Sequence, residues 1–487
     1  MVHVAIAANT FNAVTSHLRS SAWHRRSSAF PRIFACLVSV SLVSGCVVGP
    51  NYQKPETEVP AAYKELEGWK IAEPKDSVPK GKWWELFKDP VLNDLMEQVN
   101  VSNQELRAAE ARYRAARAQV AVARSGLFPT LGASANADRA RRGDGQTVNT
   151  AVVTLDAGWE IDLWGRVRRT IEAADAGAQA SAADLEAVRL LLQAELATNY
   201  FQLRVLDGGR ELLEDAVKAY ARSYQLTQNR YTAGVVSKAD VVQAESQLRS
   251  TQAQEIDTRV TRATLENAIA VLIGKPPAAV RITPVPFNVA MPGIPPGIPS
   301  TLLERRPDIA AAERRVAAAN ARIGVAQAAY FPTLSLDGRI GFTSNSFSHL
   351  FSLSNRTWSL GAGLAGTLID FGARSGQVSA AEASYDEAVA NYRQAVLAGF
   401  QEVENNLATL HWLAEESSVQ VEATRAARES VTLTSNQYKA GTVSFLNVVI
   451  VQAAQLNEER TMVNIIGRRL AATVALIRAI GGDWEHP

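Results

Sequence analysis

Residue types that commonly carry catalysis are few and scattered in this chain. Downstream of Cys46 the only histidines are His349, His411 and His486, and each stands alone. They offer neither the closely spaced ligands of a zinc site nor a Cys–His or Ser–His–Asp set. The glycines form no phosphate-binding loop after a predicted strand. The sequence therefore predicts a protein that is not an enzyme and that uses no metal or other cofactor.

Cys46 lies in a sequence that suggests a covalent modification. Cys46 ends the sequence LVSGC at 42–46, after a basic stretch that closes at Arg32 and an apolar run at 33–43. A run of that length suits a signal-peptide core and is too short for a spanning helix. The pattern resembles the bacterial lipoprotein signal, so we expect a covalent lipid on Cys46. An ordinary secretory signal with a chance cysteine is the alternative.

The charge of the chain argues against a nucleic-acid partner, and its cysteine content argues against a disulfide. The chain has 50 basic and 49 acidic residues, and residues 1–45 carry four arginines and no acid. Removal of this leader leaves 46 basic residues (50 minus four) and 49 acidic ones, a net charge of −3, so no basic surface points to nucleic acid. It also removes Cys36, which leaves one cysteine and no disulfide. No later window is long and apolar enough for a spanning helix, so any membrane crossing must use strands.

An internal repeat divides the chain into two halves. The sequence FPTL at 128–131 recurs at 331–334, 203 residues later. RYTAG at 230–234 is matched by QYKAG at 437–441, 207 residues later. The halves are joined by residues 276–299, which hold eight of the 19 prolines, a density that predicts an extended linker.

Each half predicts the order helix, strand pair, very long helix, turn and helix. The first two helices of each half are expected at 91–126 and 166–231, and at 305–329 and 373–438. At 1.5 Å per residue, each long helix would span on the order of 100 Å, which indicates a coiled-coil-like assembly. Gly208 and Gly209 should weaken the first long helix by roughly 1 kcal/mol each, which predicts a local bend or break.

Four segments alternate strictly between apolar and polar residues, a pattern typical of strands with one apolar face. They are 130–138, 152–161, 333–342 and 357–367, and polar loops at 139–151 and 343–356 join each pair. Each has the roughly 9–11 residues that a tilted strand needs to cross a bilayer. Trp159 and Trp358, on the apolar faces, could be interfacial anchors or could pack between protomers.

Four strands are too few to close a barrel, for which about eight is the minimum. Unpaired strand edges in lipid are energetically forbidden. The protein must therefore assemble, and three copies, giving twelve strands, are the simplest closure.

At this point the residues match a known family. The chain resembles the TolC-like outer-membrane factors, and more closely the lipoprotein (NodT-type) branch that serves resistance-nodulation-division (RND) efflux systems. The landmarks are, in chain order, VGPNY at 48–52, Trp83-Trp84 with Phe87 and Asp89-Pro90, DLWGR at 162–166, RRPDI at 305–309, QEVEN at 401–405 and the Tyr-x-Ala-Gly turns at 231–234 and 438–441. The resemblance covers essentially the whole mature chain.

The resemblance implies an α+β membrane protein, a homotrimer with a twelve-stranded outer-membrane β-barrel. This barrel would be continuous with a twelve-helix α-barrel that crosses the periplasm. The expected segments are a signal peptide (1–45), a lipid-anchored equatorial segment (46–90), the first repeat (91–275), a proline-rich equatorial linker (276–304), the second repeat (305–481) and a C-terminal tail (482–487). Trp83 and Trp84 are expected in the core of the equatorial belt.

The resemblance also points to a channel constriction at the helix tips, 233–240 and 440–447. In this family the tips close the periplasmic end, and rings of acidic residues line it. The candidate residues are the turn residues Gly234, Ser237, Gly441 and Ser444 and the constriction positions Asp240, Asn447 and Ile450. Asp240 matches a family acid, whereas Asn447 and Ile450 stand where acids are frequent, so we expect a less acidic aperture.

A purely structural role for these residues is the alternative. Ser237-x-x-Asp240 is a capping box, and Ser444-x-x-Asn447 imitates one, so both could simply start the return helices.

The function that the resemblance implies is passive conduction. The chain would be the outer-membrane component of a tripartite efflux system, fed by an inner-membrane transporter through a periplasmic adaptor. The exit duct of a type I protein secretion system is one alternative. A periplasmic coiled-coil scaffold that does not span the membrane is another.

Overall fold

The computed structural model describes residues 47–56, 81–141, 143–285, 292 and 306–482. The predicted leader, Cys46, parts of the equatorial segment and linker, and the last residues of the tail lie outside this range. The elements are, in chain order, η1 (Trp83–Phe87), α2 (Pro90–Ser102), α3 (Gln104–Ser125), β1 (Thr130–Arg141), β2 (Thr147–Ile161), α4 (Arg166–Thr232), α5 (Lys238–Leu272), η2 (Pro277–Ala279), α6 (Pro307–Ala328), β3 (Thr333–Ser344), η4 (Phe347–His349), η5 (Leu353–Asn355), β4 (Arg356–Ala365), α7 (Ala373–Lys439) and α8 (Phe445–Ala479).

The element lengths confirm the internal repeat. α3 and α6 both have 22 residues, and β1 and β3 both have 12. The long helices α4 and α7 both have 67 residues, and the return helices α5 and α8 both have 35. Equivalent residues lie 203 apart in α3 and α6, and 207 apart from the long helices onward.

Two helix predictions were wrong in detail. The expected helix at 91–126 is two helices, because Asn103 adopts an extended backbone that ends α2, and its side chain caps the start of α3. Its side chain accepts a hydrogen bond from the Leu106 amide (2.9 Å) and donates one to the Leu272 carbonyl (2.7 Å). Conversely, α4 is not broken at Gly208 and Gly209. Gly208 is buried, so packing around it outweighs the propensity cost of roughly 1 kcal/mol.

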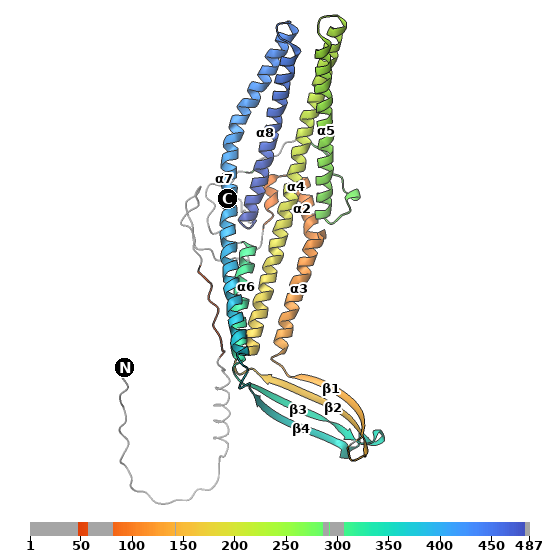
Figure 1. The fold of residues 1–487 in the computed structure, drawn as a ribbon, viewed down its shortest axis with the longest axis vertical. Coiled ribbons are helices and arrows are strands. Elements are labelled where there is room, and N and C mark those ends of the chain that lie inside the picture. The colour runs from red at the N-terminus through yellow and green to blue at the C-terminus, as the bar shows by residue number, and fades with distance from the viewer. Residues whose placement is uncertain (1–46, 57–80, 142, 286–291, 293–305, 483–487) are drawn as a thin grey trace, which may run out of the picture. The chain divides into compact units, whose positions relative to one another are not determined.

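The helices form a layer in which the two halves lie side by side and meet at α4 (Figure 1). Next to the sheet, α6 packs between α4 and α7, and α3 packs on the other side of α4. Toward the tips, α8 packs against both α7 and α4, while α5 packs against α4. No helix in the described part of the chain is long and apolar enough to cross a membrane.

The largest hydrophobic cluster among the described residues contains Trp83 and Trp84, as expected, and we call it the belt. Trp83 and Trp84 are 2% and 3% exposed, and Phe87 packs its ring 4.6 Å from that of Phe201 on α4. The cluster joins η1 and α2 to the middle of α4 and to the C-terminal ends of α5 and α8. It therefore ties both halves together at one level of the helical layer.

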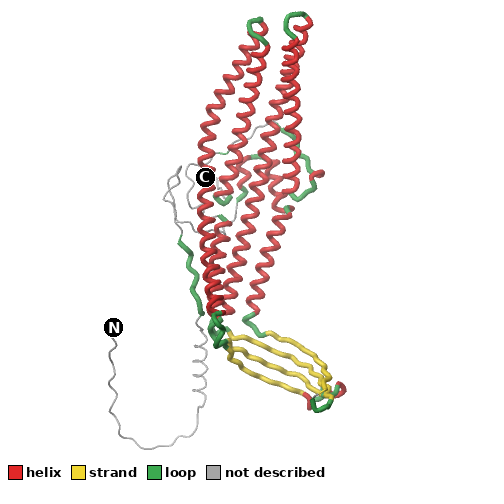
Figure 2. The backbone as a smooth tube through the Cα atoms, in the orientation of Figure 1, coloured by secondary structure: helices red, strands yellow, loops and turns green. Residues whose placement is uncertain are grey.

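The four strands form one antiparallel sheet in the order β1-β2-β3-β4 (Figure 2). Its register aligns the apolar positions of all four strands in shared rows, and the polar positions likewise. One row consists of Ala133, Leu155, Ile340 and Trp358, and the next consists of Gly132, Asp156, Arg339 and Ser359. One face is therefore apolar and the other polar, with an ion pair between Asp156 and Arg339.

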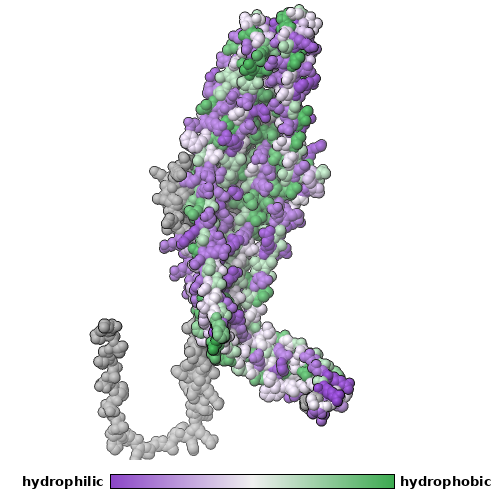
Figure 3. Space-filling view, viewed as in Figure 1, coloured by the Kyte–Doolittle hydropathy of each residue, from purple (hydrophilic) through white to green (hydrophobic). Residues whose placement is uncertain are grey.

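The strand bounds correct the predicted loops. β1 and β2 pair as far as Arg141 and Thr147, so the first loop is shorter than 139–151. The second contains η4 and η5. Hydrophilic residues gather at this loop end of the sheet (Figure 3).

Candidate functional site

The two helix tips close with the same backbone geometry. Gly234 and Gly441 have positive φ values of 75° and 80°. The amide after each glycine bonds back across the last turn, from Val235 to the Arg230 carbonyl (2.8 Å) and from Thr442 to the Gln437 carbonyl (3.1 Å). This is the glycine-terminated helix end expected from the sequence.

Asp240 completes a capping box at the first tip. The Ser237 hydroxyl oxygen accepts a hydrogen bond from the Asp240 amide (3.3 Å), and the Asp240 carboxylate accepts one from the Ser237 amide (3.0 Å). Asp240 is only partly exposed. The capping prediction for this tip is confirmed.

The second tip does not imitate this box, so that prediction was wrong. The Ser444 side chain makes no capping hydrogen bond, and the Asn447 amide bonds only to the Ser444 backbone carbonyl (3.2 Å). Packing replaces the cap, since Phe445 is 3% exposed and its ring lies 5.3 Å from that of Tyr438. Asn447 and Ile450 are exposed beside this cluster.

A contact between the hairpins was missed by the sequence analysis. The Arg230 guanidinium lies 4.6 Å from the centre of the Tyr438 ring and donates a hydrogen bond to the Tyr438 carbonyl (3.2 Å). Val448, Val449 and Ala244 of α5 complete a hydrophobic cluster with Tyr438 and Phe445. The ends of α4 and α7 are therefore joined within one chain.

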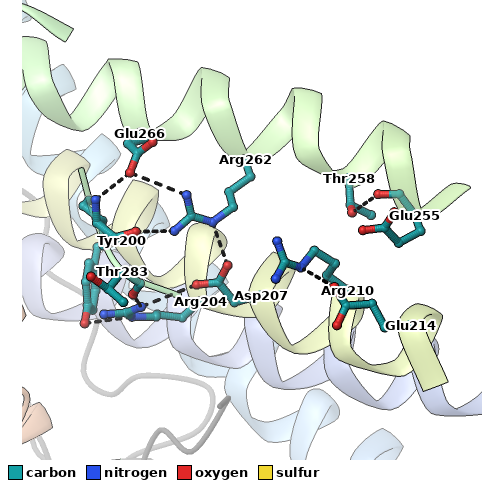
Figure 4. A network of polar contacts seen from close by, with 11 residues as sticks. Tyr200, Arg204, Asp207, Arg210, Glu214, Glu255, Thr258, Arg262, Glu266 and Thr283 are labelled. Carbon is teal, nitrogen blue, oxygen red and sulfur yellow. Dashed lines mark hydrogen bonds and ion pairs between the residues drawn. The ribbon is translucent and has the colours of Figure 1, made fainter. Parts of the chain in front are cut away.

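A buried ionic network lies farther along the hairpin (Figure 4). Arg204 donates to Asp207 (3.4 Å) and to the Thr283 carbonyl (3.0 Å), and Arg262 of α5 donates to Asp207 (2.7 Å). The side chains of Arg204 and Asp207 are 4% and 2% exposed. This network fixes the segment after η2 to α4 and α5.

Tyr200 extends the network toward the belt. Its hydroxyl donates to the Asp89 carboxylate and accepts from Arg204 Nε (2.9 Å). Burial, followed by the hydrogen bond to Asp89, raises the pKa of the Tyr200 hydroxyl well above its usual range. The contact with Arg204 joins adjacent turns of α4, whereas the contact with Asp89 joins residues 111 positions apart and could not be found from spacing.

The VGPNY landmark is a strap that binds the start of α4. Arg169 donates to the carbonyl of Val48 (3.2 Å), to that of Gly49 (3.0 Å) and to the Asn51 side chain (3.0 Å). A Cβ on Gly49 would lie 2.4 Å from the Cα of Gly324 on α6, which only glycine avoids. The strap therefore lies against helices from both halves.

The end of the strap that follows Cys46 lies at the junction of sheet and helices. Val47 packs against Gly165, the residue between β2 and α4, where an added Cβ would approach it to 2.8 Å. The Val48 amide donates to the Trp164 carbonyl (3.0 Å). Asp162 before α4 and Asp370 before α7 accept hydrogen bonds from the first amides of these helices.

Within the described residues, no three histidine, cysteine, aspartate or glutamate side chains cluster as a metal site.

Comparison with known proteins identifies this arrangement. A family profile described as "Outer membrane efflux protein" matches residues 95–275 and 298–482. The probable efflux pump outer membrane protein TtgC of Pseudomonas putida is 29% identical over 470 residues, covering 93% of this chain and 96% of TtgC. The cation efflux system protein CusC of Escherichia coli is 27% identical, covering 91% of this chain and 97% of CusC.

The fold agrees with the same assignment. The solved structure of the outer-membrane channel OprN superposes with a TM-score of 0.81 at 32% identity, covering 90% of this chain and all of that one. The sequence-based expectation of an α+β outer-membrane channel is confirmed. The chain belongs to the outer membrane efflux protein family and is an outer-membrane channel component of an efflux system.

Proposed function

We propose that three copies of this chain form the exit duct of a tripartite RND-type efflux system and conduct small molecules passively. The observation that carries the proposal is the open sheet. β1 and β4 pair with β2 and β3 only, so in the described chain each has one unpaired edge. Such edges cannot persist in lipid, and three four-stranded sheets close a barrel of twelve strands.

A periplasmic adaptor and an inner-membrane transporter are the partners of this duct. The support is geometric: each α4–α5 and α7–α8 hairpin ends in an exposed turn, at the end of the helices remote from the sheet (Figure 1). The family assignment favours this role over a scaffold that does not span the membrane.

We propose that Cys46 carries the lipid anchor. The strap residues that follow it are bound by Arg169 and lie beside Gly165, where β2 meets α4. A chain leaving this point begins at the level where the strands leave the bilayer, within reach of its surface. The docked strap supports lipidation over a chance cysteine.

We further propose that Asp240 contributes charge to the closed aperture as well as a cap. The paired hairpins bring one such carboxylate to the first tip of each chain, whereas Asn447 and Ile450 add none at the second. The closed aperture would thus be weakly acidic.

The function is tested by deleting the gene, complementing it, and measuring three properties. We expect a heat-dissociable trimer in the outer-membrane fraction, single channels in planar bilayers, and restored efflux of a dye or antibiotic. An adaptor should co-purify after crosslinking. Loss of a secreted protein with unchanged small-molecule accumulation would instead favour the type I secretion alternative.

A further inference from the structure

The two faces of the sheet differ in the sign of their charges as well as in polarity. By the register of the strands, every acidic residue of β1 to β4 lies on the polar face, namely Asp138, Asp156, Glu160 and Asp337. The apolar face has no acid in these strands, and its charged residues are Arg139, Arg141 and Arg356. In an outer-membrane barrel the apolar face contacts lipid, so the lipid-facing surface of this sheet is purely basic.

The strand register places the three arginines on this face. Arg139 and Arg141 continue the alternation of β1 beyond Ala137, and Arg356 is the register partner of Phe342. All three stand at the loop end of the sheet, where hydrophilic residues gather (Figure 3). The end of the apolar face next to the helices has no charge in the described strands.

The depth of these residues in the bilayer follows from strand geometry. From Leu131 to Arg139, and from Leu364 back to Arg356, a strand rises about 26 Å at about 3.3 Å per residue. At a tilt of about 40° this is about 20 Å along the barrel axis. The apolar band of such a barrel is about 25 Å tall, so the long arginine side chains reach the headgroups of the outer leaflet.

The three guanidinium groups keep their hydrogen-bonding capacity for a ligand. Arg139, Arg141 and Arg356 are exposed, and none makes a hydrogen bond or ion pair with another described residue. The arginine on the polar face, Arg339, is paired with Asp156 instead. A guanidinium offers five donors in a planar fork that matches a phosphate group.

Apolar side chains of the second loop lie beside these charges. The Phe351 ring lies 5.5 Å from that of Phe342, so the loop packs against the apolar face next to the row of Arg356. Phe347 and Leu353 of the same loop are 70% and 82% exposed. A site for a soluble anion has no use for bare apolar side chains, whereas a lipid with a phosphate headgroup needs both kinds of contact.

We propose that Arg139, Arg141, Arg356 and Phe351 form a site for a phosphorylated lipid of the outer leaflet. The guanidinium groups bind its phosphate, and the loop contacts its acyl chains. The inference rests on the twelve-stranded barrel of the proposed function, because the arginines lie on the two edge strands of the sheet, β1 and β4, which meet only between copies.

The internal repeat predicts how the arginines meet at this seam. Within one chain β2 pairs with β3 so that Ala151 faces Ser344. The hairpin pairings place their equivalents at Trp358, 207 residues later, and at Arg141, 203 residues earlier. Trp358 of one copy therefore faces Arg141 of the next, and Arg356 lies two residues farther, about 7 Å along the strand. Each seam thus brings arginines from two copies into one basic patch.

Binding of lipopolysaccharide to the purified full-length trimer in detergent tests the site. The triple variant Arg139→Gln, Arg141→Gln and Arg356→Gln should bind fluorescent lipopolysaccharide at least about tenfold more weakly, the loss expected for one charge-assisted hydrogen bond. Enzymatic removal of the phosphates should weaken binding to the parent by a similar factor and leave binding to the triple variant almost unchanged. Equal affinity of parent and triple variant would overturn the proposal.

A control variant removes the same charge elsewhere. Arg222→Gln, Arg322→Gln and Lys439→Gln change three exposed residues of the helices and should keep the parent's affinity. A loss equal to that of the strand variant would mean attraction by net charge, and would refute a site on the sheet.

Two further ligands identify what the site binds. Inorganic phosphate should not displace lipopolysaccharide at millimolar concentration, and vesicles of phosphatidylglycerol and phosphatidylethanolamine should bind at least about tenfold more weakly. Displacement by free phosphate would indicate a site for a soluble anion, and equal binding of the vesicles would indicate general affinity for anionic lipid. Either result would contradict the assignment.

The apolar part of the site is tested through the loop. Phe347→Ser with Phe351→Ser should weaken lipopolysaccharide binding without changing its dependence on salt, because the arginines remain. Unchanged affinity would remove the loop from the site.

The site and the duct fail in different ways. Both the strand and the loop variants should form heat-dissociable, conducting trimers, because the substituted side chains are exposed. Conducting trimers that bind lipopolysaccharide equally with and without the three arginines would disprove this inference and leave the proposed function intact. Absence of a trimer in the parent protein would disprove the proposed function itself.

Discussion

Asp240 and Asn447 occupy equivalent positions in the two tips but do different work. The Asp240 carboxylate accepts a hydrogen bond from the Ser237 amide, whereas the Asn447 side chain takes no part in a cap. The first tip therefore depends on a polar cap and the second on the packing of Phe445. This difference allows the capping and charge roles of Asp240 to be separated.

Asp240→Asn keeps an acceptor for the Ser237 amide but removes the charge, while Asp240→Ala removes both. We expect Asp240→Ala to destabilise the tip by about 1 kcal/mol and Asp240→Asn by less. If charge contributes to the closed aperture, both variants should raise single-channel conductance and antibiotic permeability similarly. Asp257→Asn, an exposed change on the same helix, is the control. Unchanged conductance in both Asp240 variants would leave Asp240 as a cap alone.

Asp207→Asn should strongly destabilise the protein. It leaves the buried Arg204 and the mostly buried Arg262 without their shared carboxylate, for which a cost of about 3–5 kcal/mol is typical. Asp215→Asn, on the same helix but in an exposed pair with Lys218, should cost no more than about 1 kcal/mol. Thermal dissociation of the purified trimer measures both, and equal losses would contradict a structural role for the network.

Contacts at the site could be predicted from the sequence only where the two partners are close together in the chain. The Ser237–Asp240 cap spans three residues, so a local pattern predicted it. The contacts of Asp207 with Arg262, and of Arg230 with Tyr438, join residues 55 and 208 positions apart. No local spacing encodes them, and only the folded helix pairs bring them together.

At the scale of elements, the long helices were predicted to within about a residue because glycines end them. Gly165 and Gly372 have φ values of 84° and 93° before α4 and α7, and Gly234 and Gly441 follow their ends. The break at Asn103 was missed although its cap on the Leu106 amide is local; the bond from its side chain to the Leu272 carbonyl of a distant helix could not be found from the sequence. The strands were predicted well, since alternation alone specifies which face is apolar.

Asn103→Ala tests whether this residue makes the break. It removes the cap on the Leu106 amide and the bond to Leu272 (2.7 Å), so we expect a loss of about 1–2 kcal/mol. Gln104→Ala, at the next and exposed position, should change stability by less than about 0.5 kcal/mol. Denaturant unfolding followed by circular dichroism measures both. A loss no larger than that of the control would mean that belt packing, rather than the cap, sets the break.

At the scale of the whole molecule, the repeat explains why one chain is incomplete. Each half supplies two strands, two long helices and one tip. α6 and α8 of the second half pack against α4 of the first, whereas α7 has far fewer buried residues than α4. The sequence predicted assembly from strand number, and the structure agrees in that β1 and β4 each have one unpaired edge in the described chain.

The anchor and the barrel should be separable, because different forces hold them. Cys46→Ser should abolish incorporation of radiolabelled palmitate but still give a heat-dissociable trimer, since strand closure and helix packing do not involve the lipid. Cys36→Ser, within the predicted leader, should keep the label. Arg169→Ala should also keep the label yet lower trimer stability, because it releases the strap from three hydrogen bonds. Palmitate incorporation by Cys46→Ser would disprove the anchor, and failure of that variant to form trimers would make the lipid part of assembly itself.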